Sequence, residues 1–108
     1  MPTTTSAAEH PAASRPGYVI GHITVRDPGK WRDYCAAVPA SLAPWRAEIV
    51  FRGQRHAVFH GSHDHQLTVV IRFPDIAAAT HWHASPAYQT LVPLRNAAAD
   101  VTLLGFDT

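Results

Sequence analysis

The sequence is poor in cysteine and lysine, and it has no long apolar run. Cys35 is the only cysteine among 108 residues, which excludes an intrachain disulfide. Lys30 is the only lysine and the net charge is +1, so the sequence lacks the clustered cations that neutralise nucleic-acid phosphates. No apolar run approaches the ~18 residues of a membrane-spanning helix. We therefore expect no disulfide scaffold, no nucleic-acid partner and no membrane span.

The first 16 residues are rich in Thr, Ser, Ala and Pro and contain little that a core could bury. They have neither the basic nor the apolar segment of a secretory signal, and a lone thiol fits the reducing cytoplasm. Their composition predicts a disordered tail over residues 1–16 and a single domain over residues 17–108. Hydrophobic residues make up 46% of the chain and charged residues 16%. This slightly apolar composition suggests that a partner covers part of the apolar surface.

Five segments predict β-strands, because each is rich in β-branched and aromatic residues and is bounded by turn-forming residues. The segments are 18–26, 47–52, a short one at 55–60, 66–73 and 100–107. Between 60 and 66 the chain is polar and rich in histidine, which predicts a loop. The total of eight histidines is the unusual feature of the composition.

Three helix starts are marked by residues that cap the first turn. Asp27-Pro28 begins the first helix, and Asp75 begins a second that is expected to run to about residue 84. Ser85-Pro86 repeats the combination of cap and proline and predicts a third helix. The expected elements therefore alternate between strand and helix along the chain.

Proline also predicts where these helices end, because it lacks the backbone N–H of a helical hydrogen bond. We expect Pro39 and Pro44 to end the first helix. Pro93 lies inside the third helix and is expected to kink or break it near Val92.

This order predicts an α+β fold of the ferredoxin-like βαββαβ kind, with a mixed, antiparallel-type sheet and helices on one face. The other face of the sheet is then bare. A bare apolar face is most simply covered by a second copy, so we expect a homodimer that forms an α+β barrel.

The segments 17–45 (GYVIGHITVRDPGKWRDYCAAVPASLAPW) and 71–100 (IRFPDIAAATHWHASPAYQTLVPLRNAAAD) resemble a bacterial family called domain of unknown function 1330, and the resemblance extends over 17–107. Its most specific parts are Asp27-Pro28 with Tyr34, Phe73-Pro74, Trp82, and Ser85-Pro86 with Tyr88, Leu91 and Leu94-Arg95. The resemblance implies a dimeric α+β barrel, related in fold to cofactor-free monooxygenases, polyketide cyclases and stress-response proteins. It implies no established reaction. His83 departs from the pattern, since the family tends to carry an aromatic residue there.

Side chains alternate between the two faces of a sheet along each strand. The expected strands then have one wholly apolar face, which we place under the helices, and one mixed face. Ile49 and Phe51 are expected on the apolar face, opposite Arg52. The mixed face is expected to carry Tyr18, His22, Thr24, Glu48, Thr68 and Arg72. Apolar walls with a few polar groups suit a small-molecule site.

Three residues are candidates for catalysis. His22 titrates near neutral pH and can give or take a proton; otherwise it is a buried histidine bonded to backbone or to Glu48. Arg72 can hold an anionic or enolate oxygen; otherwise it pairs with an acid at a strand end. His60 could face the same site from the short strand at 55–60.

The expected ligand-binding residues are Tyr18, Thr24, Glu48, Thr68, Trp82 and His83. His63, Asp64 and His65 form a cluster that lacks the third and fourth ligands a zinc site needs, so a solvated loop and no metal are expected. Cys35 has no neighbouring base and is expected to be a small buried hydrophobe. No motif indicates a nucleotide or other cofactor.

Three functions remain open. The first is a cofactor-free enzyme, a cyclase, isomerase or lyase that acts by acid/base chemistry on a small, largely apolar carbonyl or polyketide-like metabolite. The second is a non-catalytic dimeric binding or stress-linked protein. The third is a cofactor-free monooxygenase. The mixed face and the excess of histidine favour the first hypothesis.

Overall fold

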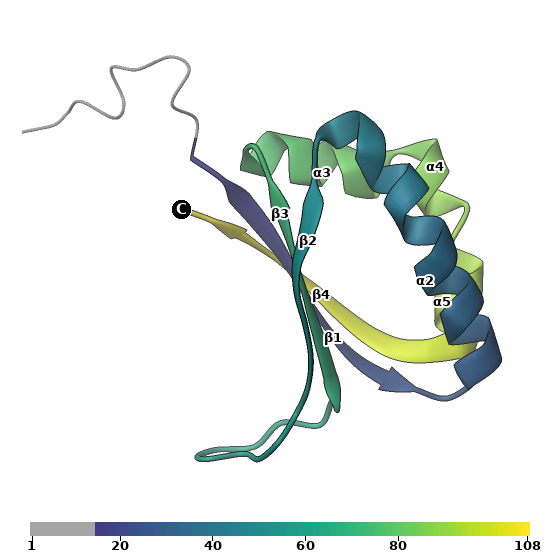
Figure 1. The fold of residues 1–108 in the computed structure, drawn as a ribbon, viewed down its shortest axis with the longest axis vertical. Coiled ribbons are helices and arrows are strands. Elements are labelled where there is room, and N and C mark those ends of the chain that lie inside the picture. Colours follow the sequence, from purple (N-terminus) through teal and green to yellow (C-terminus); the bar gives the residue numbers. More distant parts are fainter. Residues whose placement is uncertain (1–14) are drawn as a thin grey trace, which may run out of the picture.

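The computed structural model describes residues 15–108 and arranges them in two layers, a sheet and a set of helices (Figure 1). All but the last two residues of the predicted tail, 1–16, lie outside the described residues. In chain order the elements are β1 (Gly17–Val25), α2 (Pro28–Leu42), the 3-10 helix η1 (Ala43–Trp45), β2 (Glu48–Gln54), β3 (Leu67–Phe73), α3 (Ile76–Ala84), α4 (Pro86–Gln89), α5 (Val92–Ala98) and β4 (Ala99–Asp107).

The strands form one sheet in the order β2-β3-β1-β4, and every neighbouring pair is antiparallel. Within residues 15–108 the helices all pack against one face of this sheet, and the other face carries no helix (Figure 1). This order and layering are those of a ferredoxin-like fold. The predicted α+β class with helices on one face is confirmed, with antiparallel pairing throughout.

The predicted helix starts are confirmed, and each cap accepts a hydrogen bond in the way its residue type suggests. The Asp27 carboxylate accepts from the backbone N–H of residue 30 at 3.1 Å. The Asp75 carboxylate accepts from the N–H of residue 78 at 2.8 Å, and the Ser85 hydroxyl from that of residue 88 at 3.3 Å. The predicted break in the third helix is also present, because α4 ends at Gln89 and α5 begins at Val92.

Two predicted elements differ in the structure. Helix α2 continues through Pro39 to Leu42, because a proline in the last turn costs one backbone hydrogen bond while Ser41 and Leu42 gain buried positions. Residues 55–60 do not form a strand but part of a loop. Strand β3 begins only at Leu67, so beyond Arg55 this segment has no neighbouring strand to bond to. Residues 55–66, here named the β2–β3 arm, extend beyond the sheet (Figure 1).

Strand β2 contains an irregularity that alternation along the sequence did not predict. Glu48 and Ile49 pair with β3 in regular register, and then the register shifts so that Phe51 pairs with Val70. Val50 is therefore the extra residue of a β-bulge. The prediction that Ile49 and Phe51 share a face is wrong, because the bulge reverses the alternation after Val50.

The core lies between the sheet and the helices. Its largest fully buried side chains are Trp82, Tyr88 and Phe73. The Trp82 indole N–H donates to the Ser41 hydroxyl at 3.1 Å, and its ring lies 4.2 Å from that of Tyr88. The hydroxyls of Tyr88 and Tyr34 form a hydrogen bond of 2.8 Å with each other. The Tyr88 hydroxyl also accepts a hydrogen bond from an Arg95 N–H at 2.9 Å. Burial raises the pKa of Tyr34, and the neighbouring Tyr88 adds to that rise.

Candidate functional site

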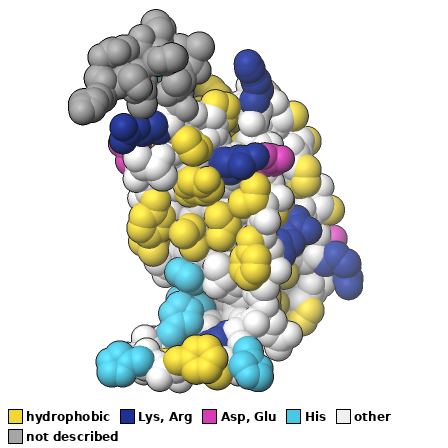
Figure 2. Space-filling view, turned by 60° about the vertical axis from the view of Figure 1, so that its left-hand side comes forward, with side chains coloured by type: hydrophobic (Ala, Val, Ile, Leu, Met, Phe, Trp, Pro, Cys, Tyr) yellow, Lys and Arg dark blue, Asp and Glu magenta, His cyan; other side chains and the backbone are white. Residues whose placement is uncertain are grey.

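The helix-free face of the sheet has an apolar centre with polar rows on both sides. The register aligns one residue from each strand across the sheet, in the row Phe51, Val70, Ile20 and Leu104. The row above contains Glu48, Arg72, Tyr18 and Phe106, and the row below contains Gly53, Thr68, His22 and Thr102. Figure 2 shows this face, with apolar side chains at its centre, an Arg next to an acidic side chain above them and histidines below. We call this surface the open face.

The register puts the polar candidates Tyr18, His22, Thr24, Glu48, Thr68 and Arg72 on the open face. They do not converge on one point. Arg72 lies opposite Tyr18 and His22 lies opposite Thr68, a separation of four residues, or roughly 13 Å, along β1. Arg72 forms an ion pair with Glu48 at the solvent-exposed surface, and this contact raises the pKa of Arg72.

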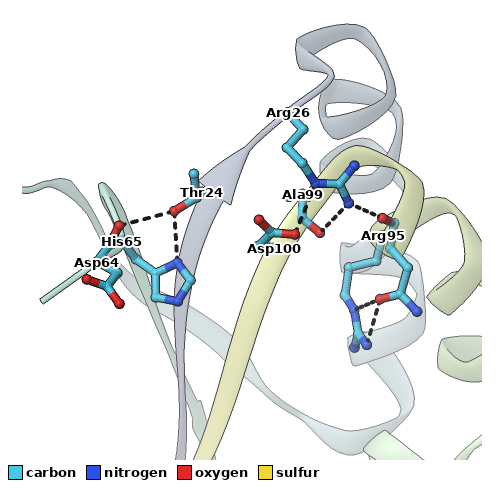
Figure 3. Close-up of polar contacts among 8 residues, drawn as sticks. Thr24, Arg26, Asp64, His65, Arg95, Ala99 and Asp100 are labelled. Atoms are coloured by element: carbon cyan, nitrogen blue, oxygen red, sulfur yellow. Dashed lines mark hydrogen bonds and ion pairs between the residues drawn. The ribbon is translucent and has the colours of Figure 1, made fainter.

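His22 belongs to a small cluster of histidines at the base of the β2–β3 arm. Its Nδ1 lies 3.1 Å from the Thr68 hydroxyl, and its ring lies 4.8 Å from that of His63. His65 follows at 5.9 Å from His63, and its Nδ1 lies 2.9 Å from the Thr24 hydroxyl (Figure 3). Burial lowers the pKa of His22, and the neighbouring His63 and His65 lower it further. Both effects favour the neutral form of the His22 ring.

The remaining candidates lie elsewhere. His60 is exposed in the β2–β3 arm and His83 is exposed on α3, whereas Trp82 is in the core with 1% of its surface exposed. Within residues 15–108, no group of three His, Cys, Asp or Glu side chains is arranged to hold a metal ion. The same residues include no helix that is both long and apolar enough to cross a membrane.

A cavity of about 330 Å³ lies on the other side of the sheet, under helix α2. Its volume falls at the small end of the range for small-molecule sites, roughly 300–1,000 Å³. Its walls are mostly aliphatic and aromatic. The lining residues are Ile23, Trp31, Tyr34, Cys35, Val38, Ile49, Arg52, Gly53, Gln54, Leu67, Thr68, Val69, Ile71, Trp82, Val101 and Leu103. Of the predicted site residues, only Thr68 and Trp82 belong to this set.

The cavity has one cation in its lining, and alternation along β2 had assigned it to the wrong face. Arg52 pairs with Val69, a cavity residue on β3, because the bulge at Val50 turns it to the helix side. The half-buried thiol of Cys35 lies in the same wall. Burial raises the pKa of Cys35, and the positive charge of Arg52 partly opposes that rise. No sequence signal marks this site, because Val50 resembles any other strand residue.

A second cavity, of about 260 Å³, lies between α3 and β4. His83, one of the predicted ligand-binding residues, lines it together with Trp82, Leu104 and Gly105. Trp82 therefore forms part of the wall of both cavities. The two spaces are separate, and only the one under α2 includes a charged side chain in its lining.

Several solved structures share this fold at low sequence identity. The RPA0582 protein of unknown function from Rhodopseudomonas palustris is 18% identical, with a TM-score of 0.74, over 100% of this chain and 95% of that chain. A dimeric ferredoxin-like protein of unknown function from Jannaschia sp. CCS1 is 10% identical, with a TM-score of 0.67, over 86% and 99%. SnoaB, a cofactor-independent oxygenase from Streptomyces nogalater, is 14% identical, with a TM-score of 0.64, over 88% and 94%.

No protein of curated function matches the chain by sequence. The model of one protein family, the domain of unknown function DUF1330, matches residues 16–107. The match covers all four strands and all the helices of the described region. It agrees with the resemblance carried by the caps and aromatic residues of the sequence, and this protein belongs to the DUF1330 family.

Proposed function

We propose that this protein binds a small, largely apolar molecule in the cavity under α2. The observation that carries the proposal is the cavity itself, a space of about 330 Å³ with mostly apolar walls. Transfer of an apolar ligand from water to walls of this kind is favourable. Aromatic walls from Trp31 and Tyr34 suit a flat apolar body, and the few polar groups in the lining suit one oriented head group.

We also propose that two copies pair through the open face. Its exposed apolar side chains support this, since Phe51 is 53% exposed, Leu104 40% and Phe106 45%. Contiguous exposed apolar surface of this kind is typical of an interface. A two-fold axis would pack the apolar row of one chain against the same row of the second chain. The ligand cavities would then lie on the outer sides of the two sheets.

Binding of a neutral fluorescent probe, N-phenyl-1-naphthylamine, tests the cavity. Val69→Phe adds an aromatic ring on the cavity side of β3 and is expected to weaken probe binding about tenfold or more, because the space is then filled. Val70→Phe is the matched control, since it makes the same change one residue along β3 but on the open face. Fluorescence titration of both variants against wild type measures the effect.

The same pair of variants distinguishes the two candidate sites. Weakened binding in Val70→Phe with wild-type binding in Val69→Phe would move the ligand to the open face, where the sequence predicted it. Equal binding in all three proteins would remove the cavity from consideration.

We propose catalysis without a cofactor as a second function, and the surroundings of His22 favour it: its ring lies on the open face beside Thr68 and His63, where burial lowers its pKa and so favours the neutral form that a general base needs. In this proposal His22 moves a proton, and Arg72, roughly 13 Å away along β1, and His60 of the β2–β3 arm bind other parts of the substrate. The reaction would be that of a cyclase, isomerase or lyase on a small carbonyl metabolite. SnoaB supports the choice of cofactor-free chemistry only through its fold.

The catalytic proposal predicts a dependence on both residue and pH. His22→Asn is expected to lower turnover of a 1,3-dicarbonyl substrate about 100-fold or more. The wild-type rate is expected to fall as pH falls through the pKa of His22, which lies below the ordinary 6.5, because the protonated ring cannot act as a base. NMR titration of the ring checks the pKa, and enolate absorbance follows the reaction.

Full turnover in His22→Asn would contradict the assignment of His22. Oxygen uptake with 1-naphthol as substrate would instead indicate a monooxygenase. Probe binding without turnover of either substrate would leave a non-catalytic binding protein.

A further inference from the structure

The β-bulge in β2 decides which face of the sheet carries Arg52. In a regular strand Arg52 would lie on the face opposite Ile49, as the sequence alone suggests. The extra residue Val50 reverses the alternation, so that Ile49 and Arg52 both line the cavity under α2. Bulges commonly re-aim a side chain next to a functional site. Here the side chain that is re-aimed carries a charge toward an apolar space.

The position of Arg52 fits the mouth of the cavity. Strand β2 is an edge of the sheet, and Arg52 is largely exposed while still lining the cavity. Its neighbours Gly53 and Gln54 line the same rim. Other lining residues belong to the core, among them Trp82 at 1% and Ile71 at 4% exposure. If a molecule enters from the β2 edge, the end of it that stays nearest to solvent lies beside the Arg52 guanidinium.

The charge of Arg52 is not neutralised within the described residues. The ion pairs of residues 15–108 are Arg26 with Asp100 and Arg72 with Glu48, and neither involves Arg52. The lining of the cavity includes no Asp or Glu among those residues. The Cys35 thiol of α2 lies in the same wall, where burial raises its pKa and the charge of Arg52 acts on it in the opposite direction. A guanidinium at the rim of an apolar space offers paired N–H donors that match a planar oxyanion.

We propose that the cavity selects an anionic ligand, a compact apolar acid whose body packs against Trp31 and Tyr34 and whose oxyanion binds Arg52 at the β2 edge. This inference rests on the proposed ligand site and adds the charge class of the ligand. The chemistry shared by its possible ligands is a delocalised oxyanion, in a carboxylate or a phenolate, on a body of one or two rings. The bulge at Val50 is the structural cause of this selectivity.

A matched pair of probes separates charge from shape. 2-Naphthoate and 2-naphthamide have the same ring body, and only the first is charged at pH 7.5. We expect wild-type protein to bind 2-naphthoate about tenfold or more tightly than the amide, because charge-assisted hydrogen bonds are stronger than neutral ones. Quenching of tryptophan fluorescence measures both affinities. Binding of 2-naphthol measured below and above the pKa of its phenol then shows whether phenolates are accepted as well as carboxylates.

Arg52→Gln is expected to abolish the preference, weakening 2-naphthoate about tenfold while leaving 2-naphthamide unchanged. Arg52→Lys keeps the charge without the planar fork and should retain part of the preference. Arg32→Gln is the matched control, since it removes one exposed positive charge from α2 outside the cavity lining. Thermal melting of each variant shows whether its fold is retained, and Arg52→Lys remains informative if Arg52→Gln is unstable.

Each outcome bears on one proposal. Equal binding of acid and amide by wild type overturns the anion selectivity, while the cavity remains a ligand site if Val69→Phe weakens both. A preference that survives Arg52→Gln, or that is lost equally in Arg32→Gln, also overturns the role of Arg52. Absence of binding by either naphthalene and by the neutral probe would overturn the proposed function and this inference with it.

Discussion

Trp82→Ala is expected to lower the free energy of unfolding by about 3–5 kcal/mol, the cost of removing a large aromatic side chain from a close-packed core. Trp82 has 1% of its surface exposed and contacts the rings of Tyr88 and Phe73, at 4.2 and 5.5 Å between centroids. Its N–H bond to Ser41 is lost as well. Trp82 also lines both cavities, so the atoms around it are already loosely packed on two sides and cannot readily fill the space that the indole leaves. Urea denaturation followed by circular dichroism measures the change.

Trp45→Ala makes the same substitution at a half-buried position in η1 and serves as the control. Trp45→Ala is expected to lower the free energy of unfolding by about 1–2 kcal/mol, because Trp45 buries less apolar area on folding than Trp82 does. Trp82→Phe keeps most of the packing and should fall between the two. An unfolding free energy for Trp82→Ala within 1 kcal/mol of wild type would show that the indole does not support the core in the way described, since effects of this size follow ordinary surface changes (about ±0.5 kcal/mol).

Leu104→Glu is expected to convert the proposed homodimer into a monomer, with a dissociation constant raised about 100-fold or more. Leu104 ends the apolar row of the open face and is 40% exposed in the single chain, so a charge there is tolerated by the monomer. In a two-fold dimer the substitution appears twice and buries two carboxylates without partners. Each unpaired carboxylate costs several kcal/mol. Because about 1.4 kcal/mol corresponds to a tenfold change in affinity, the dissociation constant rises steeply. Sedimentation velocity over a concentration series measures the shift.

Ala36→Glu adds the same charge to an exposed position of α2, on the side of the molecule away from the open face. It should leave the association unchanged. A wild-type protein that sediments as a monomer at all concentrations would refute the pairing. Dissociation caused equally by Ala36→Glu would place the interface on the helices instead.

Much of the fold was predictable from local sequence rules. Asp27, Asp75 and Ser85 each cap a helix where their position suggested, because a short polar side chain before a helical segment satisfies free N–H groups. Strands β1, β3 and β4 followed from their β-branched residues within one or two positions of their ends. The antiparallel order of the sheet then follows from connecting these elements by the shortest ferredoxin-like path.

The candidate site was less predictable, because it depends on register and on tertiary neighbours. The polar residues of β1 and β3 were assigned to the correct face, but Arg52 was not. The extra residue Val50 reverses the face on which every later side chain of β2 lies. The segment 55–60 has the composition of a strand but no partner strand to complete its backbone hydrogen bonds. The cavity under α2 arises from the packing of distant elements, and no single segment encodes it.

The order of strands also has a consequence for how the protein is made. Strand β1 is synthesised first but lies in the middle of the sheet, and its nine register pairs with β4 join the two ends of the described chain. Arg26, just after β1, forms an ion pair with Asp100 in β4 (Figure 3). At ~5–20 residues per second, β1 waits roughly 4–16 s for this partner on the ribosome. The sheet is therefore completed only after translation has passed residue 107, and until then the edge of β1 that pairs with β4 has no partner among residues 15–98.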